Sequence, residues 1–321
     1  AVVLDLIKQG RLTPETMFRV SEKAWRTGGS KMFVLVDTDI SVLDLLKGII
    51  VLSGNDACIV MAENIAGSER AFAELMNARA KTWGLEASRF VNPTGLPHPD
   101  HVMSMLDLAR LARHLWLEHP SYRYLFSLPQ FTWSDITQPN RNPLIGELDG
   151  ALGMKTGHTE EAGYGVVGLA ERGETRRIIV VSGLESEKAR RNAALDLMET
   201  AFSSFVSHTF FEPGDRVGEG IVFAGKSQTV PLVIDQQVKM ILHRRVIEKA
   251  AAELTYAGPL RAPVRKGTEV GLLRLTIPGD PVREFPLYTG DAVAGLSFFE
   301  KVKLGLQGLL TPPEADGGQR Q

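Results

Sequence analysis

The periodicity of the apolar residues changes along this chain, and the change constrains the fold more than any other sequence feature. Up to about residue 117, apolar residues recur at helical spacing; one such series is Val42, Leu45, Leu46, Ile49 and Ile50. From Leu152 onward they form short runs bounded by turn residues, which is typical of strands. Helices followed by separate strands predict an α+β fold, with an antiparallel sheet and helices packed on it.

Two serine-led tetrapeptides fit the capping box that begins a helix. Ser41-Val42-Leu43-Asp44 precedes the series above, and Ser104-Met105-Leu106-Asp107 opens a helix that we expect to reach about Leu117, before Pro120. Further helices are predicted over residues 1–7, 56–66, 68–83 and 188–202. A β-hairpin is predicted from strands at residues 165–170 and 177–181, joined by a polar turn.

The composition changes again near residue 205. Beyond it the sequence predicts short strands over residues 221–223, 230–234, 238–242, 253–256 and 272–277. Strands this short and closely spaced indicate a small all-β sandwich or barrel. We therefore expect an α+β domain over residues 1–204 and a β-rich domain over residues 205–295.

The last part of the chain differs from both domains. Residues 296–310 combine leucines and phenylalanines with Glu300, Lys301 and Lys303, which predicts one amphipathic helix. This helix could pack on the protein surface, or it could lie in the plane of a membrane interface. Residues 311–321, which include Pro312 and Pro313, are predicted to be disordered.

Composition argues against several classes of function. The formal net charge of −2 gives no basic surface for a polyanion, so no nucleic-acid partner is expected. Cys58 is the single cysteine, which leaves no internal disulfide and no cysteine-based metal site. The histidines lack ligand spacing such as His-Glu-x-x-His, so neither a metal nor a cofactor is predicted. No apolar run is long enough to cross a bilayer.

Two tripeptides, Ser53-Gly54-Asn55 and Lys155-Thr156-Gly157, are the strongest chemical signal. Each alone is weak evidence, because short motifs occur by chance and need structural context. Ser53 alone could be the N-cap of the following helix, and Lys155 alone could be a solvated residue at a strand end. Their context agrees with a shared site, since the first lies in a loop between two helices and the second lies where a strand begins, just before the hairpin.

The tripeptides and their surroundings resemble those of D-alanyl-D-alanine carboxypeptidases, the low-molecular-mass penicillin-binding proteins of types 5 and 6. The resemblance is carried by residues 53–58, 140–144 and 155–159, together with Ala162-Gly163-Tyr164, and it extends from residue 1 to about residue 310. It implies a β-lactamase/transpeptidase-like domain at residues 1–204. It also implies that the tail helix is a peripheral anchor on the outer face of the cytoplasmic membrane, with the protein in the periplasm.

The resemblance implies a role for each residue of the first tripeptide and for the lysine of the second. Ser53 would relay a proton toward the leaving D-alanine, and Asn55 would hold the substrate amide. Lys155 would supply positive charge near Ser53 and the substrate carboxylate. These roles match the needs of acyl transfer, which requires a nucleophile, a base, a proton carrier and an anion stabiliser.

The remaining implied residues bind the substrate's end. Thr156 and Arg190 would hold the terminal carboxylate, which suits the planar fork of a guanidinium. Gly157 would let the substrate approach the strand, and the backbone N–H of His158 would form half of an oxyanion hole. Arg191 is adjacent to Arg190, so the match could slip by one residue, or both could be ordinary exposed charges. His158 as the base of a Ser-His-Asp triad is rejected, because no Gly-x-Ser-x-Gly elbow is present.

The first motif of this superfamily, Ser-x-x-Lys with its nucleophilic serine, is missing. No lysine in the sequence has a serine three positions before it. Residue 1 also falls inside an apolar helical pattern. We therefore expect the chain to be truncated at its N-terminus, with the motif a few residues before Ala1, and the 321 residues alone to be inactive.

The predicted function is a serine-type D-Ala-D-Ala carboxypeptidase that trims peptidoglycan pentapeptides through an acyl-enzyme and is inhibited by β-lactams. One alternative is a class A-like β-lactamase, which needs a deacylating glutamate; no convincing Glu-x-x-Leu-Asn lies between the two tripeptides. The other is a non-catalytic peptidoglycan-binding protein that uses Lys155, Thr156 and Arg190 to bind D-Ala-D-Ala termini. The residues upstream of Ala1 would separate these functions.

Overall fold

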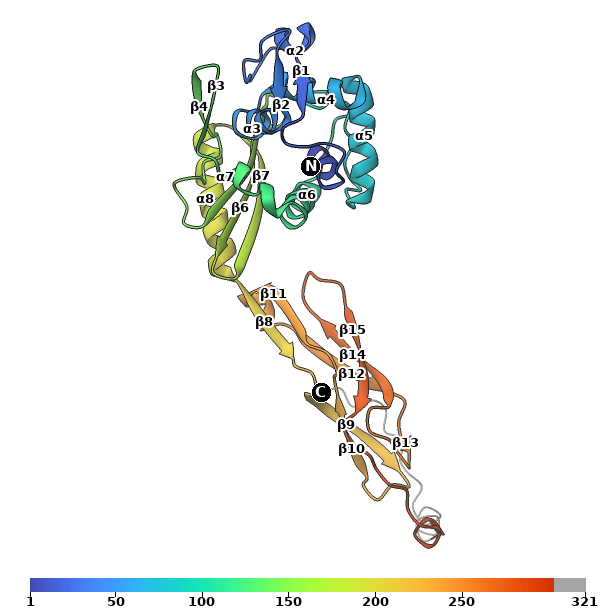
Figure 1. Ribbon diagram of the computed structural model, residues 1–321. Coiled ribbons are helices and arrows are strands. Elements are labelled where there is room, and N and C mark those ends of the chain that lie inside the picture. Colours follow the sequence, from blue (N-terminus) through green and yellow to red (C-terminus); the bar gives the residue numbers. More distant parts are fainter. Residues whose placement is uncertain (303–321) are drawn as a thin grey trace. The chain divides into compact units, whose positions relative to one another are not determined.

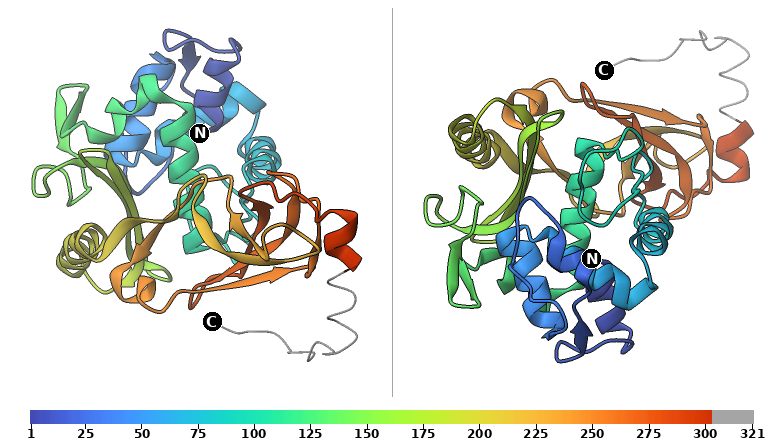
Figure 2. Two further views of the ribbon diagram at one scale, coloured as in Figure 1. Left: turned by 90° about the horizontal axis from the view of Figure 1, so that it is seen from below. Right: turned by 90° about the horizontal axis from the view of Figure 1, so that it is seen from above.

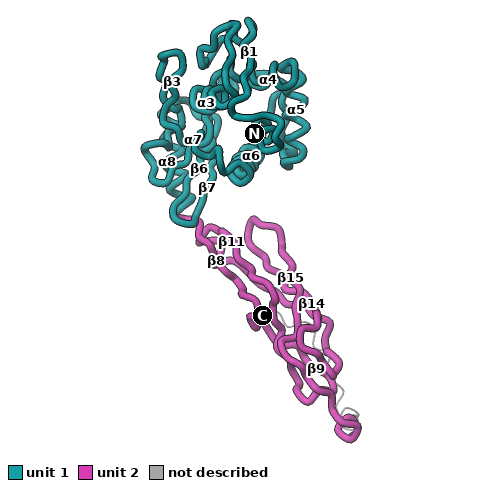
Figure 3. Tube along the Cα trace, viewed as in Figure 1, with its two compact units in different colours: residues 1–202 teal, residues 203–321 magenta. Residues whose placement is uncertain are grey.

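The computed structural model describes residues 1–302, and the chain divides into two compact units, residues 1–202 and residues 203 onward (Figure 3). The first unit contains helices α1 to α8 and strands β1 to β7. The second unit is built almost wholly from strands (Figure 1). This confirms the predicted fold class, an α+β part followed by an all-β part.

Capping serines define the helices of the first unit. Ser41 Oγ accepts a hydrogen bond from the N–H of Asp44 and Ser104 Oγ accepts one from the N–H of Asp107, each at 3.1 Å, which confirms both predicted capping serines. Ser68 caps a third helix in the same way. The helices are α1 (Val2–Lys8), α2 (Glu22–Arg26), α3 (Val42–Leu52), α4 (Asn55–Ala66), α5 (Glu69–Thr82), α6 (Met105–Glu118), η1 (Pro120–Tyr122), α7 (Tyr124–Ser127) and α8 (Glu187–Ser204).

A three-stranded antiparallel sheet in the order β5-β6-β7 organises this unit. Its strands are β5 (Ala151–Thr159), β6 (Gly163–Arg172) and β7 (Thr175–Leu184), and the β6–β7 hairpin is the predicted one. Two short antiparallel strand pairs were not predicted. They are β1 (Met17–Arg19) with β2 (Asp39–Ser41), and β3 (Gln130–Trp133) with β4 (Ile136–Pro139). They are too short to give a clear alternation of apolar residues.

The two faces of the β5-β6-β7 sheet bury different cores. Because side chains alternate along a strand, Val167 and Leu169 of β6 join the larger core, which includes residues of α1, α3 and α4. Val166 and Ala170 face the other way and pack with Ala194 and Met198 of α8. The sheet therefore lies between α8 on one side and the helical cluster on the other (Figure 2). This arrangement brings strand β5 next to the junction of α3 and α4.

One sequence expectation about β5 was wrong in position. Lys155-Thr156-Gly157 lies in the middle of β5 and not at the beginning of a strand. The register between β5 and β6 shifts between Ala151 and Gly153, and Gly153 has a φ of +88°. A bulge with a left-handed glycine looks like a turn in the sequence, which hid the first residues of the strand.

The second unit has a six-stranded sheet in the order β12-β14-β15-β10-β9-β13 and a two-stranded sheet of β11 and β8. Leu232, Leu273 and Leu287 of the larger sheet share one apolar core with Val238 of β11. The elements are β8 (Phe205–Phe211), β9 (Arg216–Phe223), β10 (Thr229–Val233), β11 (Val238–His243), α9 (Arg244–Ile247), β12 (Ala251–Tyr256), β13 (Leu260–Arg261), β14 (Glu269–Thr276) and β15 (Arg283–Thr289). The five predicted strands correspond to β9, β10, β11, β12 and β14.

The last described residues, 298–302, are helical. Ser297 caps this segment. Its Oγ accepts a hydrogen bond from the N–H of Glu300 at 3.5 Å, and its own N–H and Oγ both donate to the Glu300 carboxylate. The rest of the predicted helix at 296–310 and the predicted disordered segment at 311–321 lie outside the described residues. Among residues 1–302, no helix is both long enough and apolar enough to span a membrane.

Candidate active site

Ser53 lies at the junction of two buried helices. It is the C-cap of α3 and adopts a left-handed conformation, with φ 57° and ψ 38°. Gly54 follows as the N-cap of α4, and its N–H donates a hydrogen bond to the carbonyl of Gly48 at 3.0 Å. The left-handed residue ends α3 abruptly, so that α4 starts two residues later. The hydroxyl of Ser53 is thereby held at the corner between the helices.

Asn55 is the first residue of α4, and it is 8% exposed. Its N–H donates to the carbonyl of Ser30 at 2.9 Å, and its Nδ2 donates to the carbonyl of Gly28 at 3.2 Å. Gly29 lies close above it with a φ of +75°, and a Cβ there would be 2.8 Å from Asn55 Nδ2. The amide nitrogen of Asn55 therefore fixes the segment at residues 28–30, while its Oδ1 accepts no hydrogen bond from the described residues.

Asp56 holds the next part of that segment in place. Its carboxylate is fully buried and accepts hydrogen bonds from the N–H groups of Met32, Phe33 and Val34 at 2.9, 2.8 and 3.2 Å. The negative charge also lies in the first turn of α4, where the helix dipole favours it. Asp56 thus fixes the backbone of residues 32–34, which forms one wall beside Ser53. The sequence analysis treated it only as part of a helix, because a helix-capping acid looks the same in sequence.

Lys155 reaches this corner from strand β5. Its Nζ donates hydrogen bonds to Ser53 Oγ and, at 2.9 Å, to the carbonyl of Thr156. The pKa of Lys155 is lowered to about 8, mainly by burial; the Cys58 thiol opposes this shift, and the charges of Arg141 and Arg190 contribute to it. The structure therefore brings together the two tripeptides, whose key side chains are 102 positions apart in the chain.

Arg190 lies in the first turn of α8 and is 5% exposed. Its guanidinium carbon lies 5.6 Å from the ring centre of Tyr164, and its Nη2 lies 3.5 Å from the carbonyl of Arg141. Its Nε is buried and has no hydrogen-bond partner among the described residues. Burial lowers the pKa of this guanidinium from its usual value. Arg190 also lies 3.7 Å from the exposed carboxylate of Glu187, so its Nε is the donor that is left without a partner beside strand β6.

Arg191 has a different environment from that of its neighbour. Its side chain is exposed and pairs with Glu147, with Nε donating to a Glu147 oxygen at 2.8 Å. Arg190, in contrast, is buried and lies beside Tyr164 of β6. The Glu147 pair raises the pKa of Arg191 and occupies its guanidinium.

The last two residues of the β5 motif region are exposed. Gly157 has no atom within 4 Å of the position where a Cβ would lie, so open space faces the strand there. The ring of His158 stacks on that of Tyr164, its partner in the β5–β6 register, with 3.8 Å between ring centres. Tyr164 thus contacts both His158 and Arg190. The His158 ring makes no hydrogen bond to a serine of the described residues, so no Ser-His-Asp triad is assembled.

Arg141 was not assigned a role in the sequence analysis, and it belongs to this region. Its Nη1 donates to Ser30 Oγ at 2.7 Å, its carbonyl faces Arg190, and its charge acts on Lys155.

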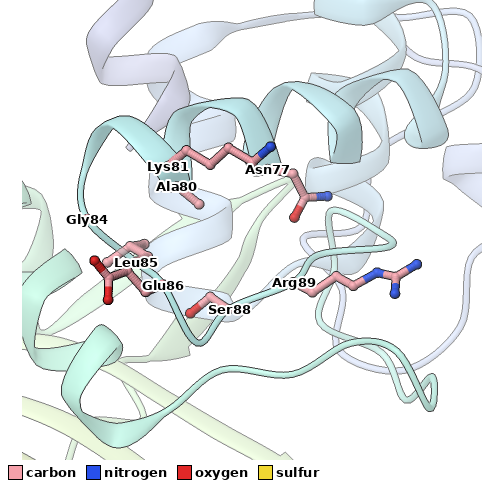
Figure 4. Close-up of a pocket in the computed structure, with 8 residues that line it drawn as sticks. All are labelled: Asn77, Ala80, Lys81, Gly84, Leu85, Glu86, Ser88 and Arg89. Atoms are coloured by element: carbon pink, nitrogen blue, oxygen red, sulfur yellow. The ribbon is translucent and has the colours of Figure 1, made fainter.

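The candidate active site is distinct from a hollow of about 450 Å³ between α5 and the loop that follows it (Figure 4). None of the residues that line that hollow, such as Lys81, Ser88 and Arg89, belongs to the site.

Comparison with known proteins identifies the family. A family model described as D-alanyl-D-alanine carboxypeptidase matches residues 1–186. The chain belongs to this family. A second model, described as the penicillin-binding protein 5 C-terminal domain, matches residues 205–294. The resemblance drawn from the motifs is confirmed, and so is the order of a transpeptidase-like domain and an all-β domain.

Individual relatives match over nearly the whole chain. D-alanyl-D-alanine carboxypeptidase DacD of Escherichia coli is 34% identical over 309 residues, covering 94% of this chain and 80% of the relative. The crystal structure of DacD from Francisella tularensis has a TM-score of 0.76 at 28% identity and covers 92% of this chain and 85% of its own. Penicillin-binding protein D2 of Listeria monocytogenes, solved in a cefotaxime-bound form, has a TM-score of 0.57 at 28% identity, covering 63% of this chain and 83% of its own.

Proposed function

We propose that this chain is part of a serine-type D-Ala-D-Ala carboxypeptidase that removes the terminal D-alanine of peptidoglycan pentapeptides through an acyl-enzyme. The hydrogen bond from Lys155 to Ser53 carries this proposal, because it joins the two family motifs at one point. Family membership supplies the reaction class. The same site would react with β-lactams, as the cefotaxime-bound relative suggests for the family.

The attacking serine and its basic lysine belong to a Ser-x-x-Lys motif that the 321 residues do not contain. We place this motif in a segment upstream of Ala1. In the proposed reaction its serine attacks the carbonyl of the penultimate D-alanine, and the bond to the last D-alanine breaks. Ser53 passes the proton to the leaving amine, since its hydroxyl oxygen already accepts from Lys155 and its own O–H remains available to donate.

Charged and small residues of the site would select the substrate. Arg190 and Thr156 are proposed to hold the free carboxylate; an arginine held 5% exposed makes strong charge-assisted hydrogen bonds. The open space in front of Gly157 leaves room for the substrate backbone. The backbone N–H of His158 is proposed as an oxyanion donor, and Asn55 Oδ1 as the acceptor for a substrate amide.

A fluorescent penicillin tests this proposal directly. The chain extended upstream through Ser-x-x-Lys should be labelled covalently, and it should release D-alanine from a pentapeptide. Replacing the serine of that motif by alanine should remove on the order of 10⁴- to 10⁶-fold of the rate. The matched control is the 321-residue chain, which should not be labelled.

Other outcomes would favour the alternative functions. Rapid hydrolysis of the penicillin by the extended protein would indicate a β-lactamase. Binding of D-Ala-D-Ala peptide by the folded, extended protein without labelling or D-alanine release would indicate a non-catalytic peptidoglycan-binding protein. Stoichiometric labelling of the 321-residue chain would place the nucleophile elsewhere and contradict our assignment.

We also propose that the protein is periplasmic and is attached peripherally to the outer face of the cytoplasmic membrane through residues 296–310. In the described first turn of this helix, Phe298 is 76% exposed and Phe299 is 84% exposed. Two adjacent exposed phenylalanines suit an interfacial helix. Vesicles of anionic lipid should float the chain, and should not float a chain lacking residues 296–321 or a Phe298→Ser/Phe299→Ser variant. Equal recovery of all three forms in the soluble fraction would contradict this attachment.

A further inference from the structure

Three metal-ligating side chains meet on the helical side of the first unit. Asp5 comes from α1, His114 comes from α6, and His119 is the C-cap of α6. Asp5 Oδ1 lies 3.0 Å from His119 Nε2 and 3.7 Å from His114 Nε2. One ligand atom from each of the three residues lies within 4.8 Å of the other two. None of these residues takes part in the candidate active site.

The spacing of these atoms suits one small cation. In a tetrahedral zinc site with bonds of 2.0–2.1 Å, neighbouring ligand atoms are about 3.4 Å apart. The separations of 3.0 and 3.7 Å from Asp5 Oδ1 to the two imidazole nitrogens lie on either side of that value. Two imidazoles with one carboxylate form a donor set that zinc and neighbouring divalent transition metals favour.

Among the described residues, Asp5 is the polar group near the Nε2 atoms of both imidazoles. Nε2 of His114 and Nε2 of His119 are both buried and have no hydrogen-bond partner among the described residues. His119 is 4% exposed, so water does not replace a partner readily. The His114 ring packs 4.8 Å from the ring of Trp83.

A hollow lies beside the cluster. A small hollow of about 180 Å³ is lined by His119 together with Leu4, Ile7, Lys8, Glu118 and Tyr122. At its edge, Lys8 Nζ donates to a Glu118 carboxylate oxygen at 2.7 Å, with both side chains about half exposed. A metal site needs an entry path and an open coordination position. Because His119 lines the hollow, we take the hollow as the side from which an ion would enter.

We propose that Asp5, His114 and His119 form a binding site for a divalent transition metal of the zinc type, which links α1 to α6. Asp5 and the two histidines lie far apart in the sequence, so a bound ion would join the start of the described chain to the end of α6. Its role would be structural, because the ligands are not among the residues that approach Ser53 and Lys155. This inference does not depend on the proposed peptidase function.

Cobalt(II) spectroscopy and zinc calorimetry on the full chain test this site. Co²⁺ should give visible absorption bands typical of tetrahedral coordination, and Zn²⁺ should bind with one-to-one stoichiometry and abolish those bands. Zn²⁺ should also raise the melting temperature of the chain, and EDTA should reverse the rise, because a ligand that binds only the folded state stabilises it.

Conservative variants assign the ligands. Asp5→Asn and His114→Gln should each weaken zinc binding about 10- to 100-fold or more and remove the cobalt bands. His98→Gln, which changes an exposed histidine outside the cluster, is the matched control and should bind as the parent chain does. His119 is the most buried of the three, so His119→Gln would change packing as well as metal binding; His114→Gln is therefore the decisive variant. Absence of the cobalt bands in the parent chain, or equal zinc affinity in the parent, Asp5→Asn and His114→Gln chains, would overturn the proposal.

Discussion

Lys155 donates a hydrogen bond to the hydroxyl oxygen of Ser53, which lies 102 positions earlier in the chain. Since an ammonium group can only donate, Ser53 Oγ must accept, and its single hydrogen is left to point elsewhere. The polarity of this hydrogen bond is therefore fixed: while Lys155 is charged, the hydrogen of the Ser53 hydroxyl points away from the lysine. Any change in that charge should alter what the hydroxyl can do.

The first prediction concerns pH. Burial lowers the pKa of Lys155 to about 8, so the side chain is charged below that pH and loses its charge above it. If positive charge is needed, acylation of the extended protein by a fluorescent penicillin should fall above pH 8, by about tenfold per pH unit once Lys155 is mostly neutral. The measurement is the acylation rate between pH 6 and pH 10.

Lys155→Arg is the matched variant for this measurement, because arginine stays charged over the whole range. Its acylation should be slower, since the guanidinium has a different shape, but the loss attributed to Lys155 above pH 8 should disappear. A parent rate that increases through pH 8 would mean that Lys155 acts in its neutral form and would refute the charge argument.

The second prediction separates the two adjacent arginines. Arg190→Ala should lower kcat/KM on a peptide with a free D-Ala-D-Ala carboxylate roughly ten- to a hundred-fold, because charge-assisted hydrogen bonds are worth about 1.5–3 kcal/mol each. The loss on a C-terminally amidated peptide should be small. Arg191→Ala is the control and should leave both values nearly unchanged, since Arg191 is exposed and pairs with Glu147. Equal losses on both peptides would show that Arg190 does not recognise the carboxylate.

The third prediction concerns the wall beside Ser53. Asp56→Ala leaves the N–H groups of Met32, Phe33 and Val34 buried without an acceptor, which should cost about 3 kcal/mol or more of unfolding free energy. Asp56→Asn keeps one acceptor oxygen and should lose about half as much. All four tryptophans lie between residues 25 and 133, so urea unfolding followed by tryptophan fluorescence reports on this unit. Equal stability of the parent and Asp56→Ala chains would show that these hydrogen bonds contribute little.

The fourth prediction compares two glycines of strand β5. Gly153 has a φ of +88°, and a Cβ there would collide with the carbonyl oxygen of Phe126, so Gly153→Ala should destabilise the unit by about 2–4 kcal/mol. Gly157 has an ordinary φ and open space around it, so Gly157→Ala should change stability by less than about 0.5 kcal/mol.

The acylation rate should depend on Gly157, although the stability does not. Gly157→Ala in the extended protein should slow penicillin acylation by about tenfold or more, because a methyl group would displace the substrate from the strand. The measurement is the second-order acylation rate of a variant whose unfolding curve matches that of the parent. Parent-like acylation by Gly157→Ala would show that no substrate approaches the strand there.

Local signals in the sequence predicted the helices well. Ser41 and Ser104 were identified as capping residues because a cap is decided by residues three positions apart. The β6–β7 hairpin was predictable for the same reason, since both strands flank one polar turn. Strands β8 and β15 were not found, because the apolar pattern of each strand alone is weak; the partner of β8, β11, also lies beyond two intervening strands in the chain.

The site was predictable only where a family motif marked it. Ser53, Lys155 and Arg190 were named from motifs, and the structure brings them into one region. The contribution of Asp56 to the wall depends on backbone N–H groups, which every residue carries and no sequence pattern distinguishes. The Asp5, His114 and His119 cluster is formed by the packing of α1 against the end of α6, so the spacing of histidines along the chain gave no sign of it.

The left-handed backbone of Ser53 has a consequence for how this family can vary. Glycine adopts that conformation freely, whereas serine holds it at a cost of roughly 1 kcal/mol or more. Stability alone would therefore favour glycine at position 53. The chain instead has a hydroxyl at a position where the backbone conformation disfavours a side chain. If Ser53 relays the proton as we propose, a glycine here would stabilise the fold and lower turnover, so stability and activity would oppose each other at a single residue.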